Sequence, residues 1–260
     1  MLRINDPRTG DPTAAAPARR GLTRVVAHVP RPDTTGLRVL LTADVLVRAL
    51  EIGGTPVWTV LTGTEGRAEL RARAAELGIR PFEDERDVTP GLGEAQVLHV
   101  LARTDTDTGA GADTGTGGPA AGEPVGGLRV EVAPAGVGTG VADDADSATA
   151  LRLALLARPR GQTLRLGAAD LTDAGNQLKH WRSAVAAWAT RPSGPIPDPV
   201  RDQLRAAWED DLDVPAVLDV LRKVETSGTV PDGARFETYA YADRLLGLEL
   251  TRDIGRGAPA

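Results

Sequence analysis

A glycine-rich run ahead of an expected helix is the first feature with a chemical use. Gly136, Gly138 and Gly140 alternate with Val137 and Thr139. Glycines let backbone N–H groups converge, and a helix N-terminus favours negative charge, so the run can hold an anion such as a phosphate group. A flexible turn is the alternative, because short glycine runs also occur in plain turns.

Composition limits metal and nucleophile chemistry. The chain has no cysteine, which excludes disulfides, thiolate metal ligands and a cysteine nucleophile. Its three histidines, His28, His99 and His180, fall in different expected elements and lack the spacing of metal ligands. We therefore expect no metal site and assign no catalytic residue.

Two charged clusters allow a binding role. Lys179, His180 and Arg182 lie off the apolar stripe of their expected helix and can contact RNA backbone, although a solvated helix face is the simpler interpretation. The acidic residues at 210–213 suggest a cation site, but helix capping also explains them. A net charge of −6 gives no protein-wide positive field, so tRNA is a weakly supported partner.

The N-terminal half of the sequence alternates β-type and helical patterns. Strands are predicted at Thr23–Val29 and Thr55–Leu61, where β-branched residues cluster. Helices are predicted from about Arg38 to Ile52 and from Glu65 to Gly78, each ending at glycine. Strand and helix in alternation predict an α/β fold with a parallel sheet and right-handed crossovers.

A polar segment divides the chain. Residues 104–127 are rich in Gly, Thr and Asp without an apolar period, which predicts a flexible linker. A strand at Leu128–Ala133 follows, and then a helix with Asp143, Asp144 or Asp146 as its N-cap. We expect four regions, with boundaries at 1–103, 104–127, 128–168 and 169–260.

The last of these regions has helical periodicity. One helix is predicted to bury a stripe of apolar residues at spacings of three and four, comprising Leu171, Ala174, Leu178, Trp181, Val185 and Trp188. Asp198 with Pro199, and Asp213 with Pro215, have the residue types that begin helices. These patterns predict a C-terminal α-helical bundle. The sequence has neither a signal-peptide pattern nor a span of membrane length, so we expect a cytoplasmic protein.

Three C-terminal segments resemble cysteinyl-tRNA synthetase, a class I aminoacyl-tRNA synthetase. They read DSATALRLALLARPRGQTLRLG, WEDDLDVPAVLDVL and ARFETYAYADRLLGLEL, and they follow the order and approximate spacing of that family. LRINDPRTG and LRVLLTADVLVRALEIGGTPVWTVLT are similar to the family's opening segments. The resemblance covers about two thirds of the chain. It implies a Rossmann-like (HUP-type) parallel sheet domain followed by the helical bundle.

The same resemblance identifies candidate nucleotide contacts. Arg38 matches an arginine that follows the family's HIGH motif, which places Asp33, Thr34, Thr35 and Gly36 at the motif itself. HIGH stabilises charge on the phosphates of ATP, whereas Asp33 repels phosphate. A strand-to-helix turn capped by Asp or Thr is the alternative. Gly136, Gly138 and Gly140 stand near the position of the KMSKS loop.

Other parts of the family's machinery are missing. The only lysines are Lys179 and Lys223, so no lysine stands at the KMSKS position. His28 lies near the family's first zinc ligand, but without cysteine we expect no zinc and interpret His28 as a locally hydrogen-bonded side chain. The family's insertion is replaced by little more than the linker, and its anticodon-binding extension is not found.

Three functions therefore compete. The first is a pseudo-enzyme or interaction module, with a protein partner, that does not activate cysteine by itself. The second is an ATP-dependent ligase with a rewired site, resembling cysteine-tRNA ligase or the mycothiol cysteine ligase. The third is an RNA-binding accessory factor. ATP is a possible cofactor only under the second, and no membrane partner is expected.

Overall fold

Five parallel strands form the central sheet of the computed structural model, which describes residues 1–18, 21–63, 66–84, 94–103, 126–138 and 145–256. Their order across the sheet is β5-β4-β3-β6-β7. The strands are β3 (Leu22–His28), β4 (Val57–Thr62), β5 (Glu83–Asp84), β6 (Glu94–Ala102) and β7 (Leu128–Val132). The expected α/β class and Rossmann-type parallel sheet are confirmed.

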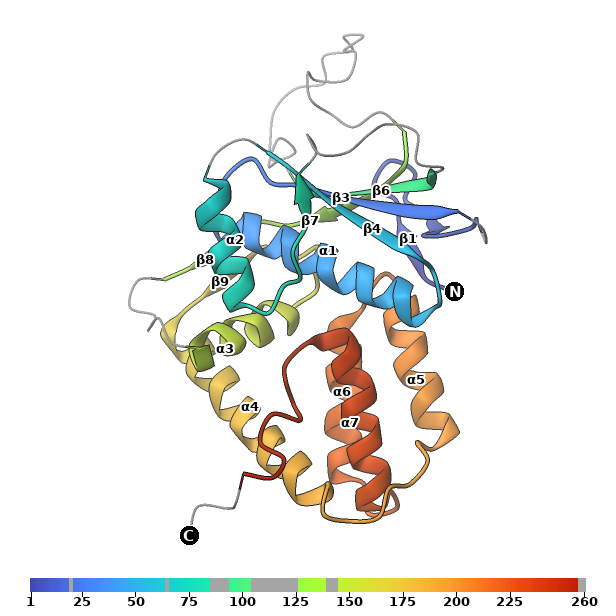
Figure 1. Cartoon of the computed structure of the whole chain (residues 1–260), viewed down its shortest axis with the longest axis vertical. Coiled ribbons are helices and arrows are strands. Elements are labelled where there is room, and N and C mark those ends of the chain that lie inside the picture. Colours follow the sequence, from blue (N-terminus) through green and yellow to red (C-terminus); the bar gives the residue numbers. More distant parts are fainter. Residues whose placement is uncertain (19–20, 64–65, 85–93, 104–125, 139–144, 257–260) are drawn as a thin grey trace.

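Two helices pack beneath this sheet in Figure 1, α1 (Thr34–Ile52) and α2 (Arg67–Glu76). The β3–α1–β4 unit matches the predicted alternation to within a few residues, except that α1 begins four residues before Arg38. Asp33 explains the earlier start, because its carboxylate caps the helix. The sheet and α1 share an apolar core here, since Val25, Ala27, Leu98 and Val100 of the sheet are fully buried along with Leu37 of α1.

Smaller pairings complete the α/β region. An antiparallel hairpin joins β1 (Arg3–Asn5) to β2 (Pro12–Ala14), and a parallel pair joins β8 (Ala135–Val137) to β9 (Leu164–Leu166). Helix α3 (Ala145–Leu156) lies between β8 and β9 along the chain. Asp146 belongs to the first turn of α3 and is not its N-cap. Asp143 and Asp144 lie outside the described residues, as does almost all of the linker expected at 104–127.

Four helices follow in the C-terminal part, and Figure 1 shows them below the sheet. They are α4 (Ala168–Trp188), α5 (Asp198–Glu209), α6 (Val214–Thr226) and α7 (Asp232–Leu246). The predicted stripe of α4 is buried at every position except Leu171, which is half-buried. In the described part of the chain, no helix combines the length and apolar character needed to cross a membrane.

Of the two helix starts predicted at Asp198 and Asp213, one has the aspartate as its N-cap. The Asp213 carboxylate accepts the Ala216 N–H at 3.0 Å and is the N-cap of α6. The prediction for Asp198 is wrong, because Pro197 is the N-cap of α5 and Asp198 is its first helical residue. Asp198 instead places its negative charge in the first turn, where the helix dipole favours it.

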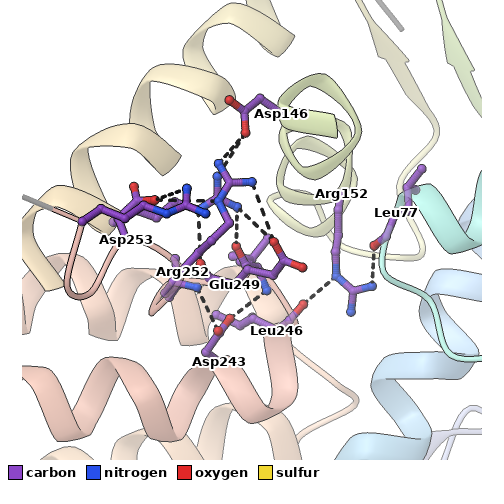
Figure 2. Close-up of polar contacts among 12 residues, drawn as sticks. Leu77, Asp146, Arg152, Asp243, Leu246, Glu249, Arg252 and Asp253 are labelled. Carbon is purple, nitrogen blue, oxygen red and sulfur yellow. Dashed lines mark hydrogen bonds and ion pairs between the residues drawn. The ribbon is translucent and has the colours of Figure 1, made fainter. Parts of the chain in front are cut away.

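Buried arginines join the α/β region to the helices that follow. Arg152 of α3 is fully buried and donates to the carbonyl oxygens of Leu77 and Leu246, as Figure 2 shows, and to the Asp44 carboxylate of α1 at 2.8 Å. Arg182 of α4 is 2% exposed and donates to the Leu248 carbonyl oxygen. The expectation that Arg182 lies on a solvated or RNA-binding face is therefore wrong.

We expect Arg152→Lys to lower the free energy of unfolding by about 1–3 kcal/mol. A lysine keeps the charge opposite Asp44 but lacks the planar fork, so buried carbonyl oxygens at Leu77 and Leu246 lose their donor. Urea denaturation followed by circular dichroism measures the change. Arg222→Lys, at an exposed ion pair on α6, is the matched control and should shift stability by less than about 0.5 kcal/mol. Equal stabilities for the two variants would contradict the role given to Arg152.

Candidate functional site

A cavity of about 660 Å³ opens at the carboxyl ends of the central strands. It is lined by His28 at the end of β3, Thr62 at the end of β4, Leu101 near the end of β6, and Gly36 at the start of α1. Strands β4 and β6 lie on opposite sides of β3, so the chain direction across the sheet reverses at this point. Ligands of open α/β sheets bind at such a switch point, which makes this cavity the candidate site.

Asp33 occupies the helix N-terminus inside this site. Its Oδ1 accepts the Gly36 N–H at 2.8 Å, and its Oδ2 lies 3.9 Å from Arg31 Nε. The α1 N-terminus would otherwise be suited to a phosphate group, because its N–H groups and dipole favour an anion. Here the chain's own carboxylate holds that position. The residues present therefore do not fit a triphosphate at this helix end.

Two glycines, Gly36 in α1 and Gly63 after β4, allow a close approach to the turn before α1. A Cβ on Gly36 would lie 2.4 Å from the Arg31 carbonyl oxygen, and one on Gly63 would lie 1.9 Å from the Val29 carbonyl oxygen. Gly63 also has φ of +126°, which side chains rarely tolerate. Close backbone approach thus fixes the turn. Next to it, half-buried Thr34 begins α1, and Thr35 Oγ1 exchanges hydrogen bonds with the backbone N–H and carbonyl of Ala135.

Arg38, the fifth residue expected near a nucleotide, points away from the cavity. It is 1% exposed and donates to the carbonyl oxygens of Ala133, Gln162 and Pro159 at 2.7–3.0 Å. Burial, with a smaller effect from the charge of Arg103, lowers the pKa of Arg38 to about 10, so it stays charged at neutral pH. Arg38 ties α1 to the segments around β8 and β9 and is not placed to contact a ligand in the cavity.

The glycine run also lies apart from the cavity. Gly136 belongs to β8 and pairs with Arg165 of β9, and the Gly138 N–H donates to the Leu166 carbonyl oxygen at 2.9 Å. An N–H that is already donated is not available to an anion. Gly140 lies outside the described residues.

Two histidines from separate strands meet at the cavity, which their spacing in the sequence did not indicate. His28 Nε2 lies 2.9 Å from His99 Nδ1, and His28 Nδ1 lies 2.8 Å from Thr62 Oγ1. His28 is hydrogen-bonded by its neighbours, as predicted. Burial of His99, then the charges of His28, Arg24 and other arginines, lower the pKa of His99 to about 4.

This pair does not fit a zinc site of the synthetase type. Both ring nitrogens of His28 are engaged by Thr62 and His99, and the chain has no cysteine to supply thiolate. In the part of the chain that the structure describes, no three histidine or acidic side chains are grouped to hold a metal ion.

Positive charge at the cavity comes from arginine. Arg31 and Arg103 line it, and Arg31 faces the Asp33 carboxylate. Arg103 donates to the Gly161 carbonyl oxygen through Nη1. The two lysines of the chain, Lys179 and Lys223, lie on α4 and α6 and do not line it. The cavity thus offers two guanidinium groups against one carboxylate, which suits a small ligand of low negative charge better than a triphosphate.

Comparison with known proteins finds partial similarity to cysteine ligases. The L-cysteine:1D-myo-inositol 2-amino-2-deoxy-alpha-D-glucopyranoside ligase of Streptosporangium roseum is 40% identical over 106 residues, which is 39% of this chain and 25% of that protein. The ligases of the same name from Kribbella flavida and Streptomyces griseus are 37% and 34% identical over 102 and 105 residues, in each case 39% of this chain and 24% and 25% of theirs. No protein-family model matches the sequence.

The matched region is thus about a quarter of the length of each relative. The relatives are ligases that act on cysteine, in agreement with the ligase resemblance drawn from the sequence. Their name corresponds to the mycothiol cysteine ligase rather than to a tRNA ligase. What the comparisons establish for this chain is similarity to cysteine ligases of the class I synthetase-like type over part of its length.

Proposed function

We propose that this protein is a cysteine-ligase-like pseudo-enzyme, in which the switch-point cavity binds a small ligand but does not activate cysteine with ATP. The observation that carries the proposal is the Asp33 carboxylate, which accepts the Gly36 N–H at the start of α1. Catalysis of adenylate formation requires donors and positive charge at that place. The buried position of Arg38 supports the proposal, because it removes a second group that could meet a nucleotide.

The division of the chain belongs to the same proposal. We assign the α/β domain to residues 1–103 and 128–168 and a helical bundle domain to residues 169–260, with 104–127 as the linker. In this arrangement the exposed faces of α4–α7 would be the surface for a protein partner. Arg152, which donates to both Leu77 and Leu246, would keep the two domains in a fixed relation.

Asp33→Asn tests the electrostatic part of the proposal. Asparagine caps a helix as well as aspartate, so the variant keeps the turn and removes one negative charge. We expect isothermal titration to show no ATP binding to the natural protein at millimolar concentration. Binding to Asp33→Asn should be tighter by about 5- to 30-fold, because removing a like charge near the phosphates is worth about 1–2 kcal/mol.

Asp219→Asn on the exposed face of α6 is the matched control and should bind no better than the natural protein. Micromolar ATP affinity in the natural protein, unchanged or weakened by Asp33→Asn, would show that the α1 N-terminus accepts phosphate and would overturn the proposal.

A ligase with a rewired site is the second candidate, and the named relatives favour it. It requires ATP, cysteine and the amino-sugar inositol in the relatives' name as co-substrates. Mass spectrometry of a mixture of all three with the protein separates the two candidates. A cysteinyl amide of the amino sugar, formed only with ATP, supports the ligase.

A further inference from the structure

Three side chains from three adjacent strands form a continuous hydrogen-bonded series at the cavity. Thr62 Oγ1 lies 2.8 Å from His28 Nδ1, and His28 Nε2 lies 2.9 Å from His99 Nδ1. The sheet fixes this arrangement, because His28 and Thr62 are register partners of β3 and β4, and β6 places His99 beside β3. The series therefore stands on rigid strands rather than on a loop.

The series runs from the cavity inward. Thr62 and His28 line the cavity and are half-buried, whereas His99 is 9% exposed and lies behind them. A ligand in the cavity therefore meets the hydroxyl and the first imidazole, and the second imidazole is not part of the cavity lining.

The Thr62 hydroxyl is placed to donate its proton to His28. Its hydroxyl has two acceptors, His28 Nδ1 at 2.8 Å and the Ala27 carbonyl oxygen at 3.5 Å. The first distance is that of a normal O–H hydrogen bond, and the hydroxyl is its donor when His28 carries no proton on Nδ1. His28 then carries its proton on Nε2 and donates it to His99 Nδ1, since a neutral imidazole has one donor and one acceptor.

His99 can act as this acceptor because it is neutral at physiological pH. Its pKa is lowered to about 4, first by burial and then by the charges of His28, Arg24, Arg129 and Arg8. A protonated His99 would have a donor on Nδ1, which would reverse the direction of the hydrogen bond between His99 and His28. A neutral His99 thus permits the tautomer of His28 that accepts the hydroxyl proton.

We propose that Thr62, His28 and His99 are a nucleophile, a general base and a positioning residue, and that the cavity hydrolyses small acyl esters. The arrangement has the features that define such a series, namely a hydroxyl within hydrogen-bond distance of a base that a third group orients. Arg31 and Arg103 line the same cavity and supply positive charge for the oxyanion of the intermediate. This activity needs no nucleotide and goes beyond the proposed function.

The reaction proceeds in two balanced steps. Thr62 Oγ1 attacks the acyl carbon while His28 Nδ1 takes the hydroxyl proton, the bond from the acyl carbon to the alkoxy oxygen breaks, and His28 returns the proton to that oxygen. Water then attacks the acyl–Thr62 ester with His28 again as base. The products are a carboxylic acid, an alcohol and free Thr62.

Hydrolysis of p-nitrophenyl acetate, without ATP or cysteine, tests the proposal. We expect turnover above the rate of buffer, a loss of about 10²-fold or more in kcat for Thr62→Val, and retention within about 10-fold for Thr62→Ser. Thr59→Val, on the same strand, is the matched control and should keep the natural rate. His180→Gln tests for acetylation of an exposed histidine, since the His180 side chain is 63% exposed.

Two further measurements distinguish a loss of catalysis from a loss of folding. Mass spectrometry of the acid-quenched protein should place an acetyl group on the peptide that contains Thr62. Nitrogen NMR of the imidazoles should show His28 protonated on Nε2, and His99→Gln should lower kcat with KM unchanged and disturb that tautomer. Turnover that is unchanged in Thr62→Val, an acetyl group on His180 instead, or no turnover at all would overturn the proposal. None of these results depends on whether cysteine is activated.

Discussion

Replacing Trp181 with alanine is expected to lower the free energy of unfolding by about 3–5 kcal/mol, the usual cost of emptying a buried site of this size. Trp181 is fully buried, and its ring meets the edge of Tyr239 at a centroid distance of 6.0 Å. Its Nε1 donates to Glu225 at 3.2 Å, which links α4 to α6. The substitution therefore removes core volume and a hydrogen bond together.

Chemical denaturation of the purified variant measures this effect. Lys179→Ala is the matched control, because Lys179 is exposed on the same helix and its loss should change stability by less than about 0.5 kcal/mol. Normal unfolding of Trp181→Ala would mean that the stripe of α4 does not form the core that the structure places there.

Several strands and helices can be predicted from the sequence, because the residue patterns that indicate them are local. Strands β3, β4 and β7 have clusters of β-branched residues, and α4 has apolar residues at helical spacing, so period and propensity are sufficient. Strand β6 was not predicted. It contains Gln96 and His99 within an apolar run, and their partners, Thr23 and His28, come from a strand more than 65 residues away.

Buried charge was likewise not predicted from the sequence. Arg38, Arg152 and Arg182 have exposures of 2% or less, although an arginine is usually expected at the surface. Each is buried because carbonyl oxygens from distant segments converge on its guanidinium group, and only the folded chain brings those oxygens together. A sequence shows the donor but not its acceptors.

The candidate site was predicted in part. The turn at Asp33 was interpreted either as a nucleotide contact or as a helix cap, and the hydrogen bond from Gly36 N–H confirms the cap. Thr35 and Gly36 do line the cavity, but Arg38 does not. The contact between His28 and His99 was missed, because β6 must first pair with β3 before the two rings can meet.

We expect the protein alone to show no cysteine-dependent exchange of pyrophosphate into ATP. In the resemblance to cysteinyl-tRNA synthetase, Asp33 stands where the HIGH motif would stabilise phosphate charge, and no lysine stands at the KMSKS position. Losing one charge-stabilising donor typically costs about 10²- to 10³-fold in rate, and both are lost here. Without a zinc–thiolate contact, cysteine and serine would also be separated by only about 10- to 200-fold, the usual range for small differences in a pocket.

The exchange assay tests the pseudo-enzyme proposal most directly. Radiolabelled pyrophosphate is incubated with the protein, ATP and each amino acid in turn, with a full-length cysteinyl-tRNA synthetase as the positive control. The proposal predicts label in ATP at the level of a no-enzyme blank for every amino acid, and full exchange in the control. Cysteine-dependent exchange that is abolished by Asp33→Ala would contradict it and would make the turn from Asp33 to Gly36 a working active site.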